Sequence, residues 1–446
     1  MFYLKNAMIV NEGRVFKGGI LIENEKIADI IDYSYNTLEP VDVKVIDIEG
    51  LHVFPGIIDS HVHFRQPGMT HKGDIYTESK AAVAGGITSI MEMPNTIPQT
   101  TTIQKLHDKI RIAEKNSLTN YAFYLGATNN NLEELLNADP SYVCGIKVFM
   151  GASTGDILVD DKNSLSSIFD KVKKLIAVHC EDEKIIQRNI SRLKQEYGDN
   201  IPIHFHPVIR SSEACYKSSL EALSLAIKYQ TRLHLLHLST KKEIELLHDI
   251  PCDNDKQITG EVCVHHLWFT ENDYDEKKSL IRWNPAIKSE SDREALRNNI
   301  NSYKIDTIST DHAPHAIEEK QQPYLKSPSG APMIQHSLLA MLDIYHKNLT
   351  SLETIADKMC HNPAKCFNVK ERGFIRKGFY ADLAIVDLNS TLKVKKSNIL
   401  YKCGWSPLEE HVFNSKVIHT FVNGKHVFNN NVFDESKKGK QLCFSK

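Results

Sequence analysis

The sequence predicts an α/β fold, a (β/α)8 TIM barrel with a small β-sandwich domain formed by the N- and C-terminal segments. From about residue 53, eight short apolar runs alternate with amphipathic stretches of helical periodicity. Alternating strands and helices form parallel strands with crossover helices, and eight such units fit a closed barrel. Short strand-like runs separated by turn residues lie before and after this region. A doubly wound open sheet is the alternative, but no glycine-rich dinucleotide loop supports it.

The elements follow in order along the chain. Residues 1–52 alternate apolar and polar positions, which predicts the N-terminal part of the sandwich. Residues 53–370 form the predicted barrel, and residues 371–446 form the C-terminal part of the sandwich, where Asn423-Gly424 marks a hairpin. The expected barrel strands are 54–58, 87–93, 121–125, 145–150, 175–179, 233–238, 258–264 and 305–309.

The composition excludes several classes of protein. A formal net charge of −2 over 446 residues gives no basic footprint for nucleic acid. The sequence contains no run of 18 or more apolar residues, so it predicts no membrane span. The nine cysteines are scattered without a CxxC pair, and the N-terminus lacks the order of a signal peptide. We therefore expect a cytoplasmic protein that acts on a small molecule, without a nucleic acid or membrane partner.

The first barrel strand leads into a His-x-His pair, His61 and His63. Side chains on a strand alternate between its faces, so these two imidazoles point the same way, and Arg65 follows them. Two imidazoles at a strand end are half of a metal site, and a guanidinium fork can hold a carboxylate. The pair alone is weak evidence, because polar alternation also occurs on half-solvated strands.

Later strand ends supply more candidate ligands. Lys147 lies in the fourth strand, His179 and His237 end the fifth and sixth, and Asp311 follows the eighth. Because strand ends meet on one face of a barrel, these side chains should converge with the first pair. Four histidines and an aspartate provide enough ligands for two divalent ions, and zinc is the metal that best suits them.

Two ions need a bridging anion. Lys147 lies in an apolar strand, where burial favours its neutral amine, and that amine could take up carbon dioxide to give a bridging carbamate. A structural ion pair is the alternative role for Lys147, and Asp156, on the following loop, is a second candidate bridge.

The expected nucleophile is a hydroxide that the metals share. Asp311 could bind a metal, accept the proton of that hydroxide and return it to a leaving amide nitrogen. Helix capping is the alternative role for Asp311. Asn284 and His315 lie in the loops after the seventh and eighth strands, on the expected substrate side.

These residues resemble the dihydroorotase branch of the cyclic amidohydrolase superfamily. The resemblance covers almost the whole barrel and is carried by PGIIDSHVHFR at 55–65, MPNT at 93–96, GIK at 145–147, VHCE at 178–181 and TDHAPH at 310–315. It implies a metal-dependent barrel that interconverts N-carbamoyl-L-aspartate and L-dihydroorotate in pyrimidine synthesis. It also implies a homodimer.

The resemblance assigns roles residue by residue. It implies that His61 and His63 bind the more buried zinc and that His179 and His237 bind the other. Asp311 becomes the catalytic acid and base. The resemblance further favours a carboxylated Lys147 as the bridge between two zinc ions per subunit. It gives the substrate-binding role to Arg65, Asn95, Asn284 and His315.

Two other functions stay open. An allantoinase, dihydropyrimidinase or hydantoinase shares the same chemistry, but a neutral ring lacks the carboxylate that Arg65 would meet. A non-catalytic scaffold homologue is the remote alternative, and such a protein usually loses metal ligands, whereas every expected ligand is present here.

Overall fold

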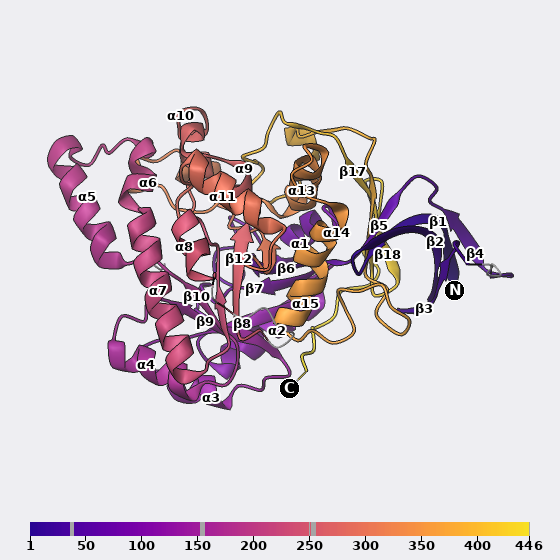
Figure 1. Cartoon of the computed structure of the whole chain (residues 1–446), viewed down its shortest axis with the longest axis horizontal. Coiled ribbons are helices and arrows are strands. Elements are labelled where there is room, and N and C mark those ends of the chain that lie inside the picture. The colour runs from indigo at the N-terminus through magenta and orange to yellow at the C-terminus, as the bar shows by residue number, and fades with distance from the viewer. Residues whose placement is uncertain (36–39, 152–156, 249, 251–255, 446) are drawn as a thin grey trace.

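The computed structural model describes residues 1–445 apart from 36–39, 152–156, 249 and 251–255. Figure 1 shows two parts side by side, a strand barrel surrounded by helices and, to its right, a curved sheet that contains the N-terminal strands. No helix in the described part of the chain is both long and apolar enough to cross a membrane.

Eight parallel strands form the barrel, and they pair in the order in which they occur in the chain. The last strand returns to the first, where His63 N donates to His312 O at 2.7 Å and nearly closes the barrel. The strands are β6 (Ile57–Val62), β7 (Ile87–Glu92), β8 (Asn120–Gly126), β9 (Val143–Phe149), β10 (Ile176–His179), β11 (Leu233–Leu235), β12 (Ile258–Cys263) and β13 (Thr307–Ser309).

Helices follow the strands and cover the outside of the barrel (Figure 1). Many begin at a side-chain cap, as where Asp74 accepts from Thr77 N at 2.8 Å. The α-helices are α1 (Ile75–Ala84), α2 (Ile103–Asn116), α3 (Leu132–Asn137), α4 (Lys162–Lys171), α5 (Glu183–Tyr197), α6 (His206–Ile209), α7 (Ser212–Tyr229), α8 (Lys241–Leu246), α9 (Val264–Trp268), α10 (Tyr274–Lys277), α11 (Glu290–Ile300), α12 (Ile317–Lys320), α13 (Ser337–His346), α14 (Leu352–Ala356) and α15 (Asn362–Cys366). The short 3-10 helices are η1 (Ile203–Phe205), η2 (Glu271–Asp273), η3 (Lys278–Ile281), η4 (Ile334–His336) and η6 (Lys396–Asn398), and η5 (Asp357–His361) is a π-helix.

The two chain ends share one mixed sheet of nine strands. Its strands run in the order β19-β18-β17-β14-β5-β1-β2-β3, and β4 pairs with β1. They are β1 (Phe2–Asn11), β2 (Arg14–Glu23), β3 (Lys26–Asp32), β4 (Lys44–Asp47), β5 (His52–Pro55), β14 (Leu383–Asp387), β17 (Lys416–Val422), β18 (Lys425–Asn429) and β19 (Val432–Phe433). A separate small pair joins β15 (Leu392–Lys393) and β16 (Val412–Phe413).

These observations confirm the predicted fold class, including the terminal domain made from both chain ends. The predicted first strand, 54–58, is divided between the two parts. β5 belongs to the terminal sheet and β6 to the barrel, and Gly56 lies between them with its N–H donating to Asp382 O at 2.7 Å. A Cβ at Gly56 would lie 2.2 Å from Thr88 Oγ1, so this crossing leaves no room for a side chain.

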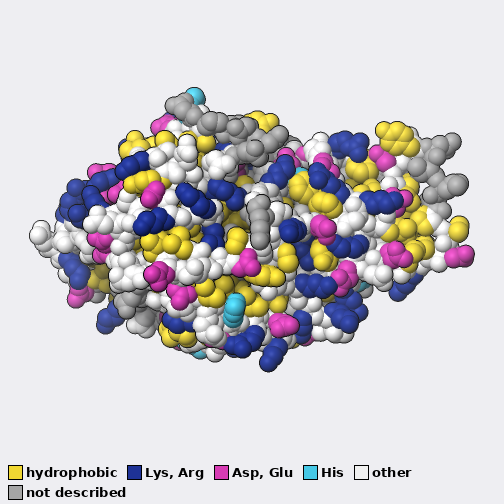
Figure 2. Space-filling view, turned by 90° about the horizontal axis from the view of Figure 1, so that it is seen from below, with side chains coloured by type: hydrophobic (Ala, Val, Ile, Leu, Met, Phe, Trp, Pro, Cys, Tyr) yellow, Lys and Arg dark blue, Asp and Glu magenta, His cyan; other side chains and the backbone are white. Residues whose placement is uncertain are grey.

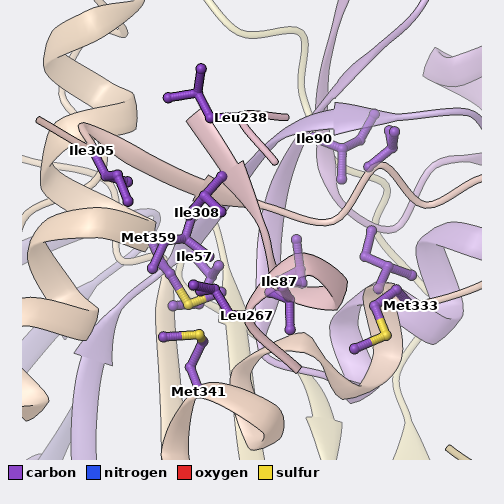
Figure 3. Packing of buried hydrophobic residues seen from close by; sticks show 14 of the residues in the cluster. Ile57, Ile87, Ile90, Leu238, Leu267, Ile305, Ile308, Met333, Met341 and Met359 are labelled. Atoms are coloured by element: carbon purple, nitrogen blue, oxygen red, sulfur yellow. The ribbon is translucent and has the colours of Figure 1, made fainter. Parts of the chain in front are cut away.

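One large apolar core joins the barrel strands to the outer helices. Ile57 and Ile308, from the first and last barrel strands, belong to the same cluster as Met341 of α13 and Met359 of η5 (Figure 3). All four side chains are almost fully buried. The burial of this apolar surface fixes the strand ends that carry the polar residues.

Candidate metal centre and active site

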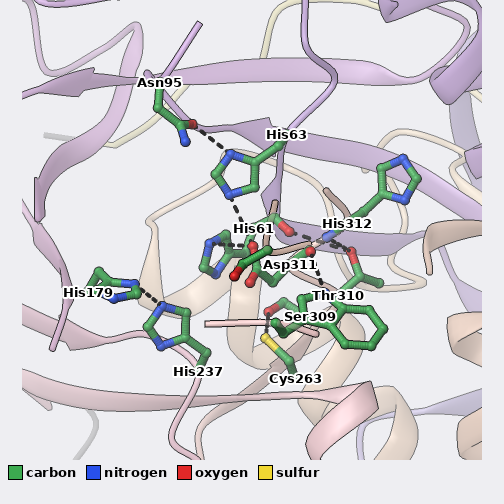
Figure 4. A network of polar contacts seen from close by, with 12 residues as sticks. His61, His63, Asn95, His179, His237, Cys263, Ser309, Thr310, Asp311 and His312 are labelled. Atoms are coloured by element: carbon green, nitrogen blue, oxygen red, sulfur yellow. Dashed lines mark hydrogen bonds and ion pairs between the residues drawn. The ribbon is translucent and has the colours of Figure 1, made fainter. Parts of the chain in front are cut away.

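The predicted metal ligands meet at the carboxyl ends of the barrel strands. Figure 4 shows the four histidines and the aspartate facing one another across this end of the barrel. Strands β6, β9, β10, β11 and β13, or the residues directly after them, supply His61, His63, Lys147, His179, His237 and Asp311. All six are buried.

Asp311 lies between the two histidines of the first strand. Its Oδ1 is 3.3 Å from His61 Nε2 and 3.0 Å from His63 Nε2. These three donor atoms lie within 4.8 Å of one another, and all three residues are buried. One carboxylate oxygen and two imidazole nitrogens at this spacing form a typical divalent-metal site.

The other two histidines form a second pair beside the first. His237 Nε2 lies 2.9 Å from His179 Nδ1, and the His237 ring centroid is 5.4 Å from that of His61. The four imidazoles therefore form one continuous group. This arrangement could hold two neighbouring ions, one at each pair of histidines.

The remaining ring nitrogen of His61 is fixed by a carboxylate. His61 Nδ1 donates to Glu261 Oε1 at 2.8 Å, and this contact directs Nε2 toward Asp311. Burial would raise the pKa of Glu261, but the neighbouring His61 and His234 hold it well below its usual value. Glu261 is therefore a carboxylate that orients His61.

Two other histidines have outer partners of the same kind. His63 Nδ1 donates to Asn95 Oδ1 at 2.7 Å, and His179 Nε2 donates to Glu181 Oε2 at 3.0 Å. Arg210 pairs with the same Glu181 oxygen. Outer partners of this kind are usual for histidines that bind a metal.

The charge states suit metal binding. Burial lowers the pKa of His63 to about 4 and lowers the pKa of His179 and His237, so these imidazoles are neutral near pH 7. Burial would raise the pKa of Asp311, but His61 and His63 hold it well below its usual value. Neutral imidazoles and an ionised carboxylate are the forms that bind metal ions.

Lys147 is buried on β9 beside these groups. Burial lowers its pKa to about 8. Its Nζ lies 4.6 Å from the centroid of the Phe149 ring, and the charges of Asp311 and Glu261 act on it, but no carboxylate of the described residues lies within 4 Å of it. The described part of the chain therefore offers no ion pair for Lys147, and the other candidate bridge, Asp156, lies outside the described residues.

Three residues at this end of the barrel adopt left-handed backbone conformations. The φ angles are +68° at Arg65, +40° at His237 and +45° at Asp311. Such angles are uncommon for residues other than glycine, and they concentrate at functional sites, where the surrounding fold holds them. The chain thus turns sharply at three of the predicted site residues.

A cationic corner lies next to the histidines. Arg65 is buried, its Nε donates to Pro314 O at 2.9 Å, and its Nη2 lies 2.8 Å from His315 Nε2. Lys72 Nζ donates to His315 Nδ1 at 3.0 Å and pairs with Glu319 at 2.8 Å, so Arg65 is the cation of this corner that has no ion pair among the described residues. Burial lowers the pKa of Arg65 to about 10, which still leaves it charged at neutral pH. This corner suits an anionic group on a ligand.

The remaining predicted residue, Asn284, contacts this corner through one intervening residue, Ser329. Ser329 connects the two, because its Oγ donates to Asn284 Oδ1 at 2.9 Å while its carbonyl lies 2.9 Å from His315 Nε2. The fold therefore brings Arg65, His315 and Asn284 to one side of the histidines. Asn95 lies instead directly against His63.

The sequence reasoning missed Glu261 and gave no role to Glu181. Glu261 lies inside the apolar run Ile258–Cys263, where a fully buried carboxylate is rare without a partner. A carboxylate inside a predicted buried strand was therefore the sequence signal that could have identified Glu261. Glu181 lies two residues after His179, within a stretch already quoted for its resemblance.

Comparisons with known proteins agree with this site. The model of the amidohydrolase family matches residues 52–427. The chain is 31% identical over 430 residues to a dihydroorotase from Methanosphaera stadtmanae, covering 96% of each chain. It is 33% identical over 419 residues to a dihydroorotase from Methanosarcina acetivorans, covering 91% of this chain and 88% of the relative.

Among solved structures, the chain is similar to the L-hydantoinase (dihydropyrimidinase) from Arthrobacter aurescens. The TM-score is 0.92 at 27% identity, with 100% of this chain and 99% of that chain covered. The barrel and the terminal sheet thus occur together in a solved enzyme structure.

Proposed function

The chain belongs to the amidohydrolase family, and from this premise we propose that it is a dihydroorotase. The proposed reaction is the reversible, zinc-dependent cyclisation of N-carbamoyl-L-aspartate to L-dihydroorotate and water. Relatives of that name cover nearly the full chain at more than 30% identity, which supports the proposal. We extend the proposal to a cytoplasmic homodimer with domain limits at 1–52, 53–370 and 371–446.

The observation that carries the proposal is the cationic corner at Arg65. L-Dihydroorotate has a ring carboxylate, whereas hydantoin, dihydrouracil and allantoin do not. The buried guanidinium beside His315 supports a carboxylate ligand, because the charges of Asp311, Glu92 and Glu319 act on it but no carboxylate among the described residues lies within 4 Å of it. In this proposal Arg65, His315 and Asn284 bind and orient the substrate, and Asn95 contributes through its amide.

The histidines and Asp311 would hold the metal ions. His61, His63 and Asp311 form one set of donors, and His179 and His237 form the other. We propose that a carboxylated Lys147 bridges the two ions, which its burial without an ion-pair partner among the described residues supports. When bound, zinc supplies an activated water and polarises the amide carbonyl.

Asp311 performs the proton transfers in this proposal. Its carboxylate lies against His61 and His63 in the first donor set, so it can accept a proton from the attacking water and deliver it to the leaving amide nitrogen. In the ring-closing direction the same carboxylate takes the proton from the attacking nitrogen. Glu261 and Asn95 hold His61 and His63 in place during both steps.

A hydantoinase or dihydropyrimidinase is the second candidate. The similarity to the L-hydantoinase structure over the whole chain favours it. The two candidates differ in the charge of the ring substrate, so Arg65 distinguishes them.

The experiment compares the wild-type protein with Arg65→Ala. Loss of the charge-assisted contact should raise KM for L-dihydroorotate by about 100-fold and change kcat less, because the contact binds substrate and transition state alike. Arg188→Ala removes an exposed guanidinium on α5 and serves as the control. An unchanged KM for L-dihydroorotate in Arg65→Ala would contradict the proposed role.

A further inference from the structure

A cavity lies at the opposite end of the barrel from the histidines. Its volume is about 650 Å³. Arg232 directly precedes β11, and Asp306 directly precedes β13, and both line this cavity. His237 and Asp311 follow the same two strands, so the barrel separates the cavity from the candidate metal centre.

The described lining of this cavity is strongly cationic. It contains five basic side chains and two acidic ones, an excess of three positive charges in a chain whose formal net charge is −2. Figure 2, seen from below the view of Figure 1, shows lysine and arginine side chains spread over that face of the molecule, with acidic side chains among them. The basic residues are Lys173, Arg232, Lys256, Lys358 and Lys365, and the acidic ones are Asp306 and Asp357.

Asp306 neutralises only one of these cations. It pairs with Lys256 at 2.8 Å and also accepts from Gly260 N at 2.8 Å. Arg232 donates to Cys366 O at 2.9 Å, and no carboxylate in the described residues lies within 4 Å of its guanidinium. Because an arginine has five N–H donors, most of those of Arg232 stay available to a ligand.

Lys358 is a second cation of this cavity that has no ion pair among the described residues. Its Nζ donates to Ser302 O at 2.7 Å and to Ile305 O at 2.6 Å, and it too lacks a carboxylate within 4 Å among the described residues. Burial lowers the pKa of both Lys358 and Arg232. An anion in the cavity would offset the cost of holding these two charges away from water.

The cavity also has an aromatic residue at its rim. Tyr303 lines it and is 76% exposed, so its ring is free to stack on a planar group. Asn301 and Asn362 also line it, and their amide nitrogens donate to Leu349 O and Asp306 O. A volume of 650 Å³ exceeds the need of an inorganic ion and falls within the range of about 300–1,000 Å³ for small-molecule sites.

We propose that this cavity is a binding site for a nucleoside phosphate, with Arg232, Lys358 and Lys365 around the phosphate and Tyr303 against the base. The inference is independent of the reaction proposed for the other end of the barrel. Phosphate carries about two negative charges near neutral pH, which matches a cavity with several unneutralised cations better than a single carboxylate does.

Calorimetry on the metal-loaded protein tests this site, with AMP, UMP and inorganic phosphate as separate probes. Arg232→Gln keeps a donor for Cys366 O but removes the charge, and it should raise Kd for the nucleotides by about tenfold. Lys365→Gln and Tyr303→Ala change exposed side chains, so neither depends on refolding of the core, and both should weaken nucleotide binding.

Two controls locate the binding. Arg65→Ala removes the cation of the candidate active site and should leave the nucleotide Kd unchanged. Lys377→Gln removes an exposed lysine of the terminal domain and should do the same. Absence of nucleotide binding, or binding that survives both Arg232→Gln and Lys365→Gln, would overturn the site. Inorganic phosphate binding as tightly as AMP and UMP, unaffected by Tyr303→Ala, would overturn the assignment to a nucleoside.

Discussion

Asp311 is the residue on which the proposed chemistry depends most. It follows β13 with a left-handed φ of +45°, and that turn directs its carboxylate at His61 and His63. A side chain that contacts both histidines is placed to bind a metal and to move a proton. The carboxylate is ionised at neutral pH because its neighbours hold its pKa low.

Asp311→Asn should lower kcat for L-dihydroorotate by about 10³-fold, because the amide keeps the shape but cannot carry the proton. The zinc content should stay close to that of the wild type, since the four histidines remain. Asp343→Asn, a buried aspartate that bonds His411 instead, is the control and should keep its activity. Steady-state kinetics and metal analysis of the same samples measure both effects.

The histidine pair could be predicted from the sequence because strand periodicity is local. The alternation at 61 and 63 already places both rings on one face, and the structure has their centroids 5.5 Å apart. The partner of His61 could not be predicted in that way. Glu261 lies 200 residues later in the chain, and only closure of the barrel brings it to His61.

At the scale of elements, β12 organises the floor of the candidate metal centre. Glu261 lies on this strand, and each of its two carboxylate oxygens accepts a hydrogen bond from a different residue. Oε1 accepts from His61 Nδ1 at 2.8 Å, and Oε2 accepts from Ser60 Oγ at 3.0 Å. His234 Nε2 of β11 lies 3.5 Å from the same Oε2. One carboxylate thus joins β6, β11 and β12.

Glu261→Gln should weaken zinc binding by about 10–100-fold, the usual effect of removing a partner that orients a metal ligand. Titration of the metal-free protein with zinc measures the change. Glu243→Gln is a matched control, because Glu243 is equally buried but bonds Ser219 and Ser239 away from the histidines. Equal zinc affinity in Glu261→Gln and the wild type would show that Glu261 does not support the metal ligands.

The stretch 351–366 has the apolar spacing of a helix, and its structure shows what that periodicity leaves out. The structure divides this stretch into α14, the π-helix η5 and α15. Pro363 lies in the first turn of α15 and has no N–H to donate to the preceding turn, so a regular α-helix cannot continue through it. In the π-helical turn the four consecutive residues 358–361 are all buried, so burial there no longer follows one helical face.

For the molecule as a whole, Asp382 joins the terminal sheet to the barrel. It forms a buried ion pair with Arg372, accepts from Asn423 N at 2.7 Å and accepts from Asn120 Nδ2 of β8 at 3.1 Å. Its carbonyl also receives the N–H of Gly56, where the chain enters the barrel. One buried aspartate therefore fixes both crossings between the two parts.

Asp382→Ala should lower the free energy of unfolding by about 3 kcal/mol, because it leaves the Arg372 charge buried and unpaired. Urea denaturation followed by tryptophan fluorescence measures this loss. Asp29→Ala is the control, since its contact with Lys377 is exposed and 3.7 Å long, and it should cost less than about 1 kcal/mol. If both variants unfold at a similar urea concentration, Asp382 does not couple the terminal sheet to the barrel.

The overall architecture could be predicted because a barrel repeats one unit that a short stretch of sequence reveals. Each strand and helix has its own period, and the eight units fix the fold together. The cationic cavity at the other end could not be predicted in the same way. Its residues come from five separate segments whose meeting depends on closure of the barrel.

The most direct test of the account is hydrolysis of L-dihydroorotate by the purified wild-type protein. Allantoin, hydantoin and dihydrouracil are assayed in parallel, and zinc is quantified in the same sample. The account predicts turnover of L-dihydroorotate alone, with about two zinc ions per chain. Activity confined to a neutral ring, or bound zinc without activity on any of the four, would contradict it.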